Sequence, residues 1–268
     1  MGNIPAGSRD PLEKLNLSLA SSKVIPPDEG ADHRVVLVAG CPRSGTTLML
    51  QQLQRELGFT VVDHLVAALW RRPDIGVVLS KKLAGISGVY SSSLQSNFGA
   101  TTNWQEPHEF SYFWRDALDC DPHRETEVRA ASVHRVCELL SSAAAQTDKP
   151  LCLKAFPALW NGSEIISQLD SAKIIVMRRE SGALRSSLEA LWRTQIKADG
   201  WASLRPSGWK QALQSSVSER IDFQQKSLVG AAEELIESDS KRVLPVRLED
   251  LVTEPQRTLA DVKYWLNV

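Results

Sequence analysis

Residues 34–56, RVVLVAGCPRSGTTLMLQQLQRE, constrain the fold of this chain more than any other stretch. An apolar, β-branched run predicts a buried strand, and Gly40 and Gly45 bound the short loop after it. Leucines at helical spacing follow at once. Such a loop can turn successive backbone N–H groups inward at the positive end of a helix, which favours an anion. The stretch therefore predicts a strand, a loop that binds phosphate or sulfate, and a helix.

The loop differs from the P-loop that binds nucleoside triphosphates. That motif reads G-x-x-x-x-G-K-[ST], with the Lys on the terminal phosphates and the hydroxyl on Mg²⁺. Gly40 and Gly45 keep this spacing, and Thr47 keeps the hydroxyl. Thr46, however, stands in the Lys position, and the cation of the loop is Arg43. A Mg-ATP-dependent P-loop kinase is therefore an alternative rather than the leading interpretation, and no metal is expected.

The heptapeptide CPRSGTT resembles the 5′-phosphosulfate loop of the sulfotransferases that use 3′-phosphoadenosine 5′-phosphosulfate (PAPS). The resemblance implies PAPS as co-substrate and a P-loop nucleotide-hydrolase-like fold. It also implies that Arg43 stabilises the sulfuryl group and the bridging oxygen of the departing phosphate. The residues that it assigns to donor binding in this loop are Pro42, Arg43, Ser44, Gly45, Thr46 and Thr47.

A second anion-binding element is predicted in KIIVMRRESGALRSSL, residues 173–188. Arg178 ends a buried-type strand, and Ser186 follows eight residues later on the next helix, so both can converge on one dianionic phosphate. This is similar to the element that binds the 3′-phosphate of PAPS in the same sulfotransferases. Arg179 with Ser187 has the same spacing, so both pairs stay open.

A general base and a second cation are needed near the loop. Lys154 ends a predicted strand and matches the lysine that many family members place beside the leaving group. Where cytosolic members that sulfate small alcohols carry a His two residues later, this chain has Phe156. The local source of a base is then the patch EPHE, in which we rank Glu106 first, His108 second and Glu109 third.

Short apolar strands alternate with helices along the chain, which predicts a central parallel sheet covered on both faces. The expected fold is therefore a three-layer α/β/α domain. We predict strands at residues 35–38, 59–62, 151–155, 173–177 and 243–248. Ligands of such sheets bind beyond the carboxyl ends of the strands, where the residues singled out above fall.

Residues 31–268 are predicted to form this single domain, and residues 1–30, rich in Gly, Pro and Ser, a flexible arm with a short helix at residues 11–19. The periodicity is weak over residues 71–103, so we expect residues 71–123 to be a lid and acceptor-binding region. Four aromatic residues of this region can stack on an acceptor or fill the core. They are Trp104, Tyr112, Phe113 and Trp114.

Composition narrows the function classes further. The 268 residues carry a net charge of −1, so no basic field indicates nucleic acid or a membrane surface. The four cysteines form no C-x-x-C pair, which argues for a reducing compartment and against a structural zinc. No apolar run is long enough for a signal peptide or a membrane span, so we predict a cytoplasmic location.

Together these features predict transfer of a sulfuryl group from PAPS to a hydroxyl or amine of a small-molecule or carbohydrate acceptor, by in-line displacement. Besides the kinase, a degenerate nucleotide-binding module is an alternative, suggested by Phe156 in place of His and by the end of the sequence at Val268, before the Gly-rich basic segment of many cytosolic members. Neither the acceptor nor the oligomeric state follows from the sequence.

Overall fold

The computed structural model describes residues 6–23, 25–88, 92–197 and 199–268. Five parallel strands form one sheet in the order β2-β3-β1-β4-β5. Their bounds are β1 Val35–Gly40, β2 Thr60–Val61, β3 Leu151–Lys154, β4 Ala172–Arg178 and β5 Val243–Arg247. The register pairs Val38 with Lys154 and Gly40 with Met177, so the carboxyl ends of the three central strands meet at one edge. The predicted parallel sheet is confirmed, with β2 shorter than expected.

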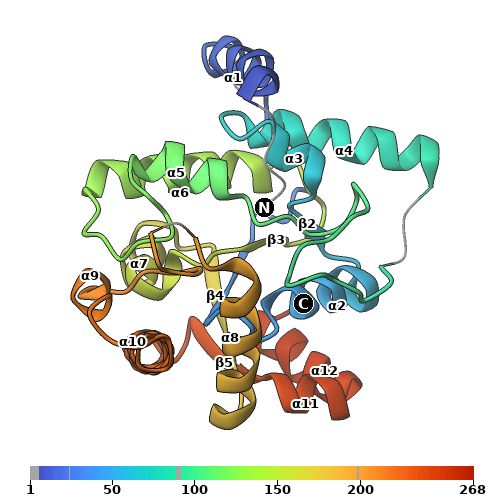
Figure 1. Ribbon diagram of the computed structural model, residues 1–268. Helices are drawn as coiled ribbons and strands as arrows, with labels where there is room; N and C mark the ends of the chain where they lie inside the picture. Colours follow the sequence, from blue (N-terminus) through green and yellow to red (C-terminus); the bar gives the residue numbers. More distant parts are fainter. Residues whose placement is uncertain (1–5, 24, 89–91, 198) are drawn as a thin grey trace.

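Helices cover both faces of the sheet (Figure 1). Val36 and Val38 of β1 pack on the side of α2 and α12, and Val35 and Leu37 on the side of α6 and α7. This alternation confirms the three-layer arrangement. The helices are α1 Ala6–Ala20, α2 Thr46–Leu57, α3 His64–Ala68, α4 Pro73–Ser87, α5 Ser111–Leu118, α6 Ala130–Ala144, α7 Ala158–Gln168, α8 Ser181–Gln195, α9 Trp209–Ala212, α10 Val217–Ser238, α11 Leu248–Thr253 and α12 Pro255–Leu266. None of them, in the described part of the chain, combines the length and apolar character needed to cross a membrane.

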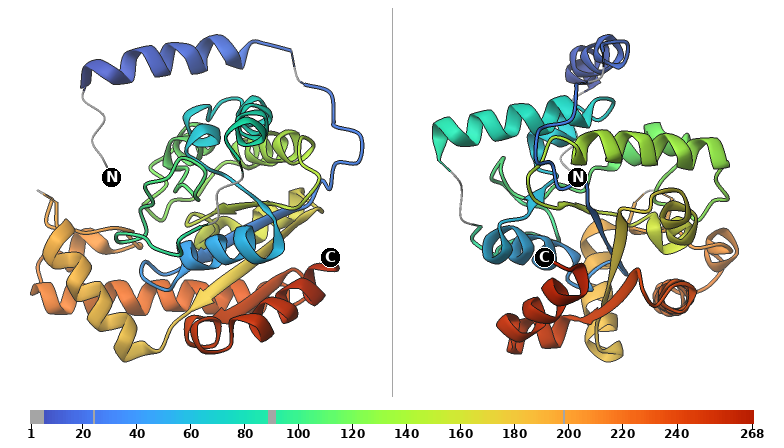
Figure 2. Two further views of the ribbon diagram at one scale, coloured as in Figure 1. Left: turned by 90° about the vertical axis from the view of Figure 1, so that its right-hand side faces the viewer. Right: turned by 180° about the vertical axis from the view of Figure 1, so that it is seen from behind.

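The N-terminal helix α1 lies at the periphery, away from the sheet (Figure 2). It contains the helix predicted at residues 11–19. The Asn16 side chain of this helix is fully buried, and its amide donates to the Ala68 carbonyl at 2.9 Å and accepts from the Arg71 N–H at 3.1 Å. The described part of the predicted arm is thus attached to the domain through Asn16, and residues 1–5 lie outside the described residues.

The structure differs from the sequence-based prediction most clearly at α4. Residues 73–87, where we expected irregular chain, form a four-turn helix that begins at Pro73. Gly76 lies so close to α3 that a Cβ there would come within 2.8 Å of the Val66 Cα. The glycine therefore permits close helix packing instead of marking a loop. Further along the chain, Ser216 and Glu219 form a capping box that starts α10.

Candidate functional site

The loop between β1 and α2 has the backbone that an anion site requires. Gly45, at the start of α2, has φ of 95°, and a Cβ on it would lie 2.5 Å from the Leu248 side chain. No side chain caps the first turn of α2, so its N–H groups face the loop. The buried Ser44 hydroxyl has no hydrogen-bond partner among the described residues. Pro42 and Thr46 are half-buried beside it. The loop can thus donate several hydrogen bonds to one anion.

Two guanidinium groups meet next to this loop. Arg43, itself at φ of 74°, donates from Nε to the Ser187 hydroxyl at 3.0 Å. Arg179 donates from Nη1 to the Arg43 carbonyl at 2.9 Å. Within the described residues neither arginine forms an ion pair with a carboxylate, and burial together with the charge of Arg179 lowers the pKa of Arg43. Two like charges this close, without a direct ion pair to a carboxylate in the described part of the chain, favour a bound anion.

Of the two arginine–serine pairs left open by the sequence, Arg179 with Ser187 is the pair at the loop. Arg178 instead forms an ion pair with Glu233 of α10 at 2.7 Å, and Ser186 donates to the Gly182 carbonyl one turn earlier in α8. Side chains alternate between the two faces of a strand, and α10 lies on the face opposite α2. Consequently the residue after the strand, not its last residue, reaches the loop.

Lys154 lies on the α2 side of the sheet edge. Its ammonium is 3.1 Å from the Glu109 carboxylate and 3.5 Å from the Thr47 hydroxyl. The charge of Lys154 is the main reason why the pKa of Glu109 is lowered, so this carboxyl group is ionised near neutral pH. The structure therefore brings together a cation, a carboxylate and a loop hydroxyl, of which Glu109 was ranked last of the three candidate bases.

The two candidates ranked above Glu109 lie elsewhere. Glu106 is only 2% exposed, and its carboxylate accepts from the Gln51 amide at 3.1 Å and the Ser92 hydroxyl at 2.9 Å. His108 accepts at Nδ1 from the Phe110 N–H at 3.0 Å, and burial lowers its pKa to about 4. His108 is thus a neutral, structurally bonded imidazole, and within the described residues neither side chain forms a hydrogen bond with Lys154 or Thr47.

Sequence reasoning missed the residues that cover the loop. The Phe98 ring lies over the Arg43 guanidinium, 5.0 Å from its carbon, and the Thr47 hydroxyl donates to the Gly99 carbonyl at 3.1 Å. The Gly at position 99 signals a turn, but no local pattern indicates what the turn covers.

Two of the aromatic candidates belong to the core. Phe113 and Trp114 are fully buried in the core, which excludes them as an acceptor platform, and Tyr112 stacks on Trp70 at 5.2 Å. Burial raises the pKa of the Cys41 thiol to about 12, so this residue of the loop is not a reactive thiolate.

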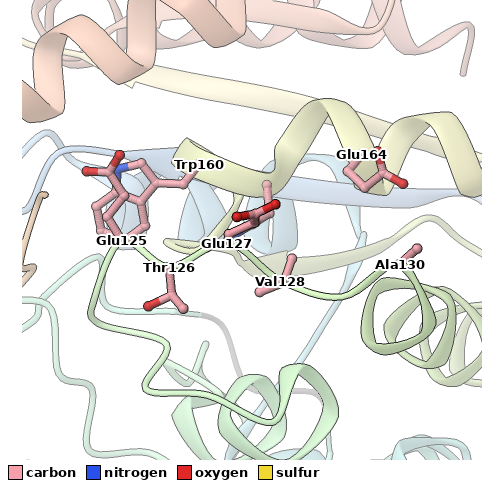
Figure 3. Close-up of a pocket in the computed structure, with 8 residues that line it drawn as sticks. Glu125, Thr126, Glu127, Val128, Ala130, Trp160 and Glu164 are labelled. Carbon is pink, nitrogen blue, oxygen red and sulfur yellow. The ribbon is translucent and has the colours of Figure 1, made fainter.

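A separate groove runs between α7 and residues 125–130 (Figure 3). Trp160 and three glutamates, Glu125, Glu127 and Glu164, line it. None of the residues predicted for anion binding or catalysis lies in it, and its acidic rim is unsuited to a phosphate.

Comparison with known proteins agrees with this geometry. A family model described as the sulfotransferase family matches residues 36–268. The fold is similar to that of sulfotransferase STF9 from Mycobacterium avium, with a TM-score of 0.58 and 14% identity over 97% of this chain and 69% of that one. It is also similar to sulfotransferase STF1 from Mycobacterium tuberculosis H37Rv, with a TM-score of 0.52 and 14% identity over 98% and 72%.

No curated protein sequence gives a match. At 14% identity the two solved structures show the fold, and they confirm the expected P-loop-like α/β/α arrangement. The family match extends from the first strand to the last residue of the sequence. This chain therefore belongs to the sulfotransferase family.

Proposed function

We propose that this protein transfers a sulfuryl group from PAPS to a hydroxyl or amine of a small-molecule or carbohydrate acceptor. Membership of the sulfotransferase family supports sulfuryl transfer in general. The donor is supported by one observation above all: Arg43 donates to the Ser187 hydroxyl, and Arg179 donates to the Arg43 carbonyl. Two phosphate-binding elements this close suit a nucleotide with phosphates on both its 5′ and 3′ sides.

In this proposal the loop holds the 5′-phosphosulfate. The N–H groups at the start of α2, the Ser44 hydroxyl and the hydroxyls of Thr46 and Thr47 donate to it. Arg179 and Ser187 hold the 3′-phosphate, in preference to the pair that precedes each of them by one residue. Arg43 lies between the two phosphates and neutralises both.

The chemistry needs positioning and charge more than covalent catalysis. The acceptor oxygen attacks sulfur as the bond from sulfur to the bridging phosphate oxygen breaks, and the departing bisphosphate keeps the electron pair. Lys154 stabilises the charge on that oxygen. Glu109 is our candidate base, and it accepts the acceptor proton once bond formation to sulfur has made that proton acidic. Residues 71–123, which supply Glu109 and of which Phe98 and Gly99 contact the loop, are the proposed acceptor region.

We further propose a cytoplasmic location, supported by four unpaired cysteines that suit a reducing compartment. Neither nucleic acid nor a membrane is proposed as a partner, since the net charge of −1 gives no basic field.

Calorimetry with adenosine 3′,5′-bisphosphate in the presence of a chelator tests the donor assignment. We expect binding to the wild type, a loss of about tenfold or more in Arg179→Ala, and little change in Arg178→Ala. The second variant is a matched control, because it removes the same side chain from the neighbouring position, where Glu233 pairs with it.

Absence of binding to the wild type would refute the donor. ATP turnover that requires Mg²⁺ would favour the kinase alternative instead. Binding of the bisphosphate without sulfate transfer to any acceptor in a panel of alcohols, amines and sugars would indicate the degenerate nucleotide-binding module.

A further inference from the structure

A tight turn at residues 97–100 lies directly over the anion-binding loop. Its first and last residues exchange two backbone hydrogen bonds of 2.8 and 2.9 Å, and its two central residues, Phe98 and Gly99, have φ of 50° and 87°. Phe98 covers the Arg43 guanidinium, and the Gly99 carbonyl accepts the Thr47 hydroxyl proton. The tip of the turn thus contacts both sides of the loop.

The tip has little spare room. A Cβ on Gly99 would lie 3.2 Å from the Thr47 hydroxyl and 3.3 Å from the Lys154 ammonium. In the proposed function Thr47 binds the donor and Lys154 stabilises its leaving oxygen. The turn therefore occupies the position at which sulfuryl transfer is proposed.

A buried polar cluster holds the chain that leads to the turn. The Glu106 carboxylate accepts from Ser92 at 2.9 Å and from Gln51 at 3.1 Å, and the Gln51 amide also donates to the Gln95 carbonyl at 3.0 Å. Glu106, Ser92 and Gln51 are each at most 2% exposed. Gln51 lies one turn after Thr47 on α2, so one face of this helix holds both the chain and its tip.

The contact at Thr47 is incompatible with donor binding through the same hydroxyl. A hydroxyl has one proton, so Thr47 donates either to the Gly99 carbonyl or to a phosphate oxygen. The carbonyl also presents partial negative charge where the donor would present its own. Binding of the donor must therefore break the bond between Thr47 and Gly99.

We propose that residues 92–101 form a strap that closes over the loop in the unliganded protein and is released when the donor binds. Glu106 acts as the latch of this strap, a positioning residue, and not as a base. The inference rests on the proposed function, because the donor site is the loop. Since only the open form binds donor, the apparent affinity is the intrinsic affinity multiplied by the fraction of open molecules.

The test compares Gln51→Ala with the wild type and with Gln54→Ala. The control removes the same side chain from the same helix, where it donates to the Gln105 carbonyl at 2.7 Å and forms no hydrogen bond with the strap in the described part of the chain. Amide hydrogen exchange reports the opening of residues 92–101, and calorimetry reports the Kd of adenosine 3′,5′-bisphosphate.

We expect the strap to be protected in the unliganded wild type and to exchange at least about tenfold faster when the bisphosphate is bound. In Gln51→Ala the unliganded strap exchanges faster, and the bisphosphate binds about tenfold more tightly. Gln54→Ala behaves like the wild type. Tighter binding after the loss of two hydrogen bonds is not a result that general structural damage produces. Ser92→Ala, which removes the latch bond from the strap side, provides the same test if Gln51→Ala does not fold.

The inference would be overturned, while the proposed donor stands, if bisphosphate binding left the protection of the strap unchanged. It would also be overturned if both latch variants bound the bisphosphate no more tightly than the wild type. If the wild type does not bind the bisphosphate, the proposed function and the release step fail together. In that case exchange of the unliganded strap in Gln51→Ala decides the latch alone.

Discussion

Replacing Glu109 by Gln tests the assignment of the base. The variant keeps the shape of the side chain and removes the charge that lies 3.1 Å from the Lys154 ammonium. A positioned general base contributes about 10²–10⁴-fold to the rate, which corresponds to roughly 3–5 kcal/mol of the barrier. We therefore expect sulfate transfer from PAPS to slow by about 10²–10⁴-fold, with the KM for PAPS changed much less.

If Glu109 is the base, the rate of transfer should depend on pH through the ionisation of its carboxyl group. Lys154 lowers the pKa of Glu109 from its ordinary value of 4.5, so the carboxylate that accepts the proton is present down to a pH below that value. The same shift stabilises the fold above the unfolded pKa, and this contribution is lost as the pH falls through the folded pKa. In the wild type kcat/KM should fall on the acid side only below pH 4.5, and in Lys154→Met this limb should move to higher pH.

Two controls make the result decisive. Glu106→Gln and His108→Gln alter the two neighbouring candidates, neither of which forms a hydrogen bond with Lys154 among the described residues. If Glu109→Gln kept its rate within about threefold of the wild type while one of the controls lost about a hundredfold, the base would be the residue altered in that control. The contact between Glu109 and Lys154 would then not identify the base.

Two further predictions concern stability. Gly45→Ala adds a methyl group 2.5 Å from the Leu248 side chain at a left-handed φ. We therefore expect it to lower the free energy of unfolding, measured by urea titration, by about 2–5 kcal/mol. A loss below about 1 kcal/mol would contradict the contact. Asn16→Ala leaves the Ala68 carbonyl without its donor and should cost about 1–3 kcal/mol by the same assay, whereas Ser18→Ala on the exposed side of α1 should be neutral; equal effects would show that α1 does not dock through Asn16.

The sequence predicts the parts of this fold whose signal is local. The apolar run before Gly40, the spacing of the loop and the leucines after it are close together in the chain, and each element forms as predicted. The strands that carry Lys154 and Arg178 are predicted for the same reason. The carboxyl ends of the strands meet because parallel strands must be joined by crossovers.

The choice between Arg178 and Arg179 depends on long-range structure. Alternation along β4 separates the two side chains, but only the packing shows that α10 covers one face and α2 the other. Which of Glu106, His108 and Glu109 lies beside Lys154 also depends on long-range contacts. The backbone N–H of His108 donates to the Val62 carbonyl beside β2. No local pattern indicates this bond, which helps to place Glu109 beside Lys154.

Glycine misled the prediction at α4 because its two roles look alike in a sequence. Gly76 permits contact with Val66, whereas Gly99 permits the turn over the loop. Both read as breaks in periodicity, and tertiary packing decides between them.

In the proposed function the loop and Arg179 together bind a nucleotide with phosphates on its 5′ and 3′ sides. Calorimetry with adenosine 3′,5′-bisphosphate and adenosine 5′-monophosphate, on the wild type, Arg179→Ala and Arg178→Ala, isolates the 3′-phosphate. We predict that the wild type and Arg178→Ala prefer the bisphosphate by about tenfold or more, and that Arg179→Ala loses this preference. Equal affinity of the wild type for the two nucleotides, or a preference that survives in Arg179→Ala, would contradict the claim.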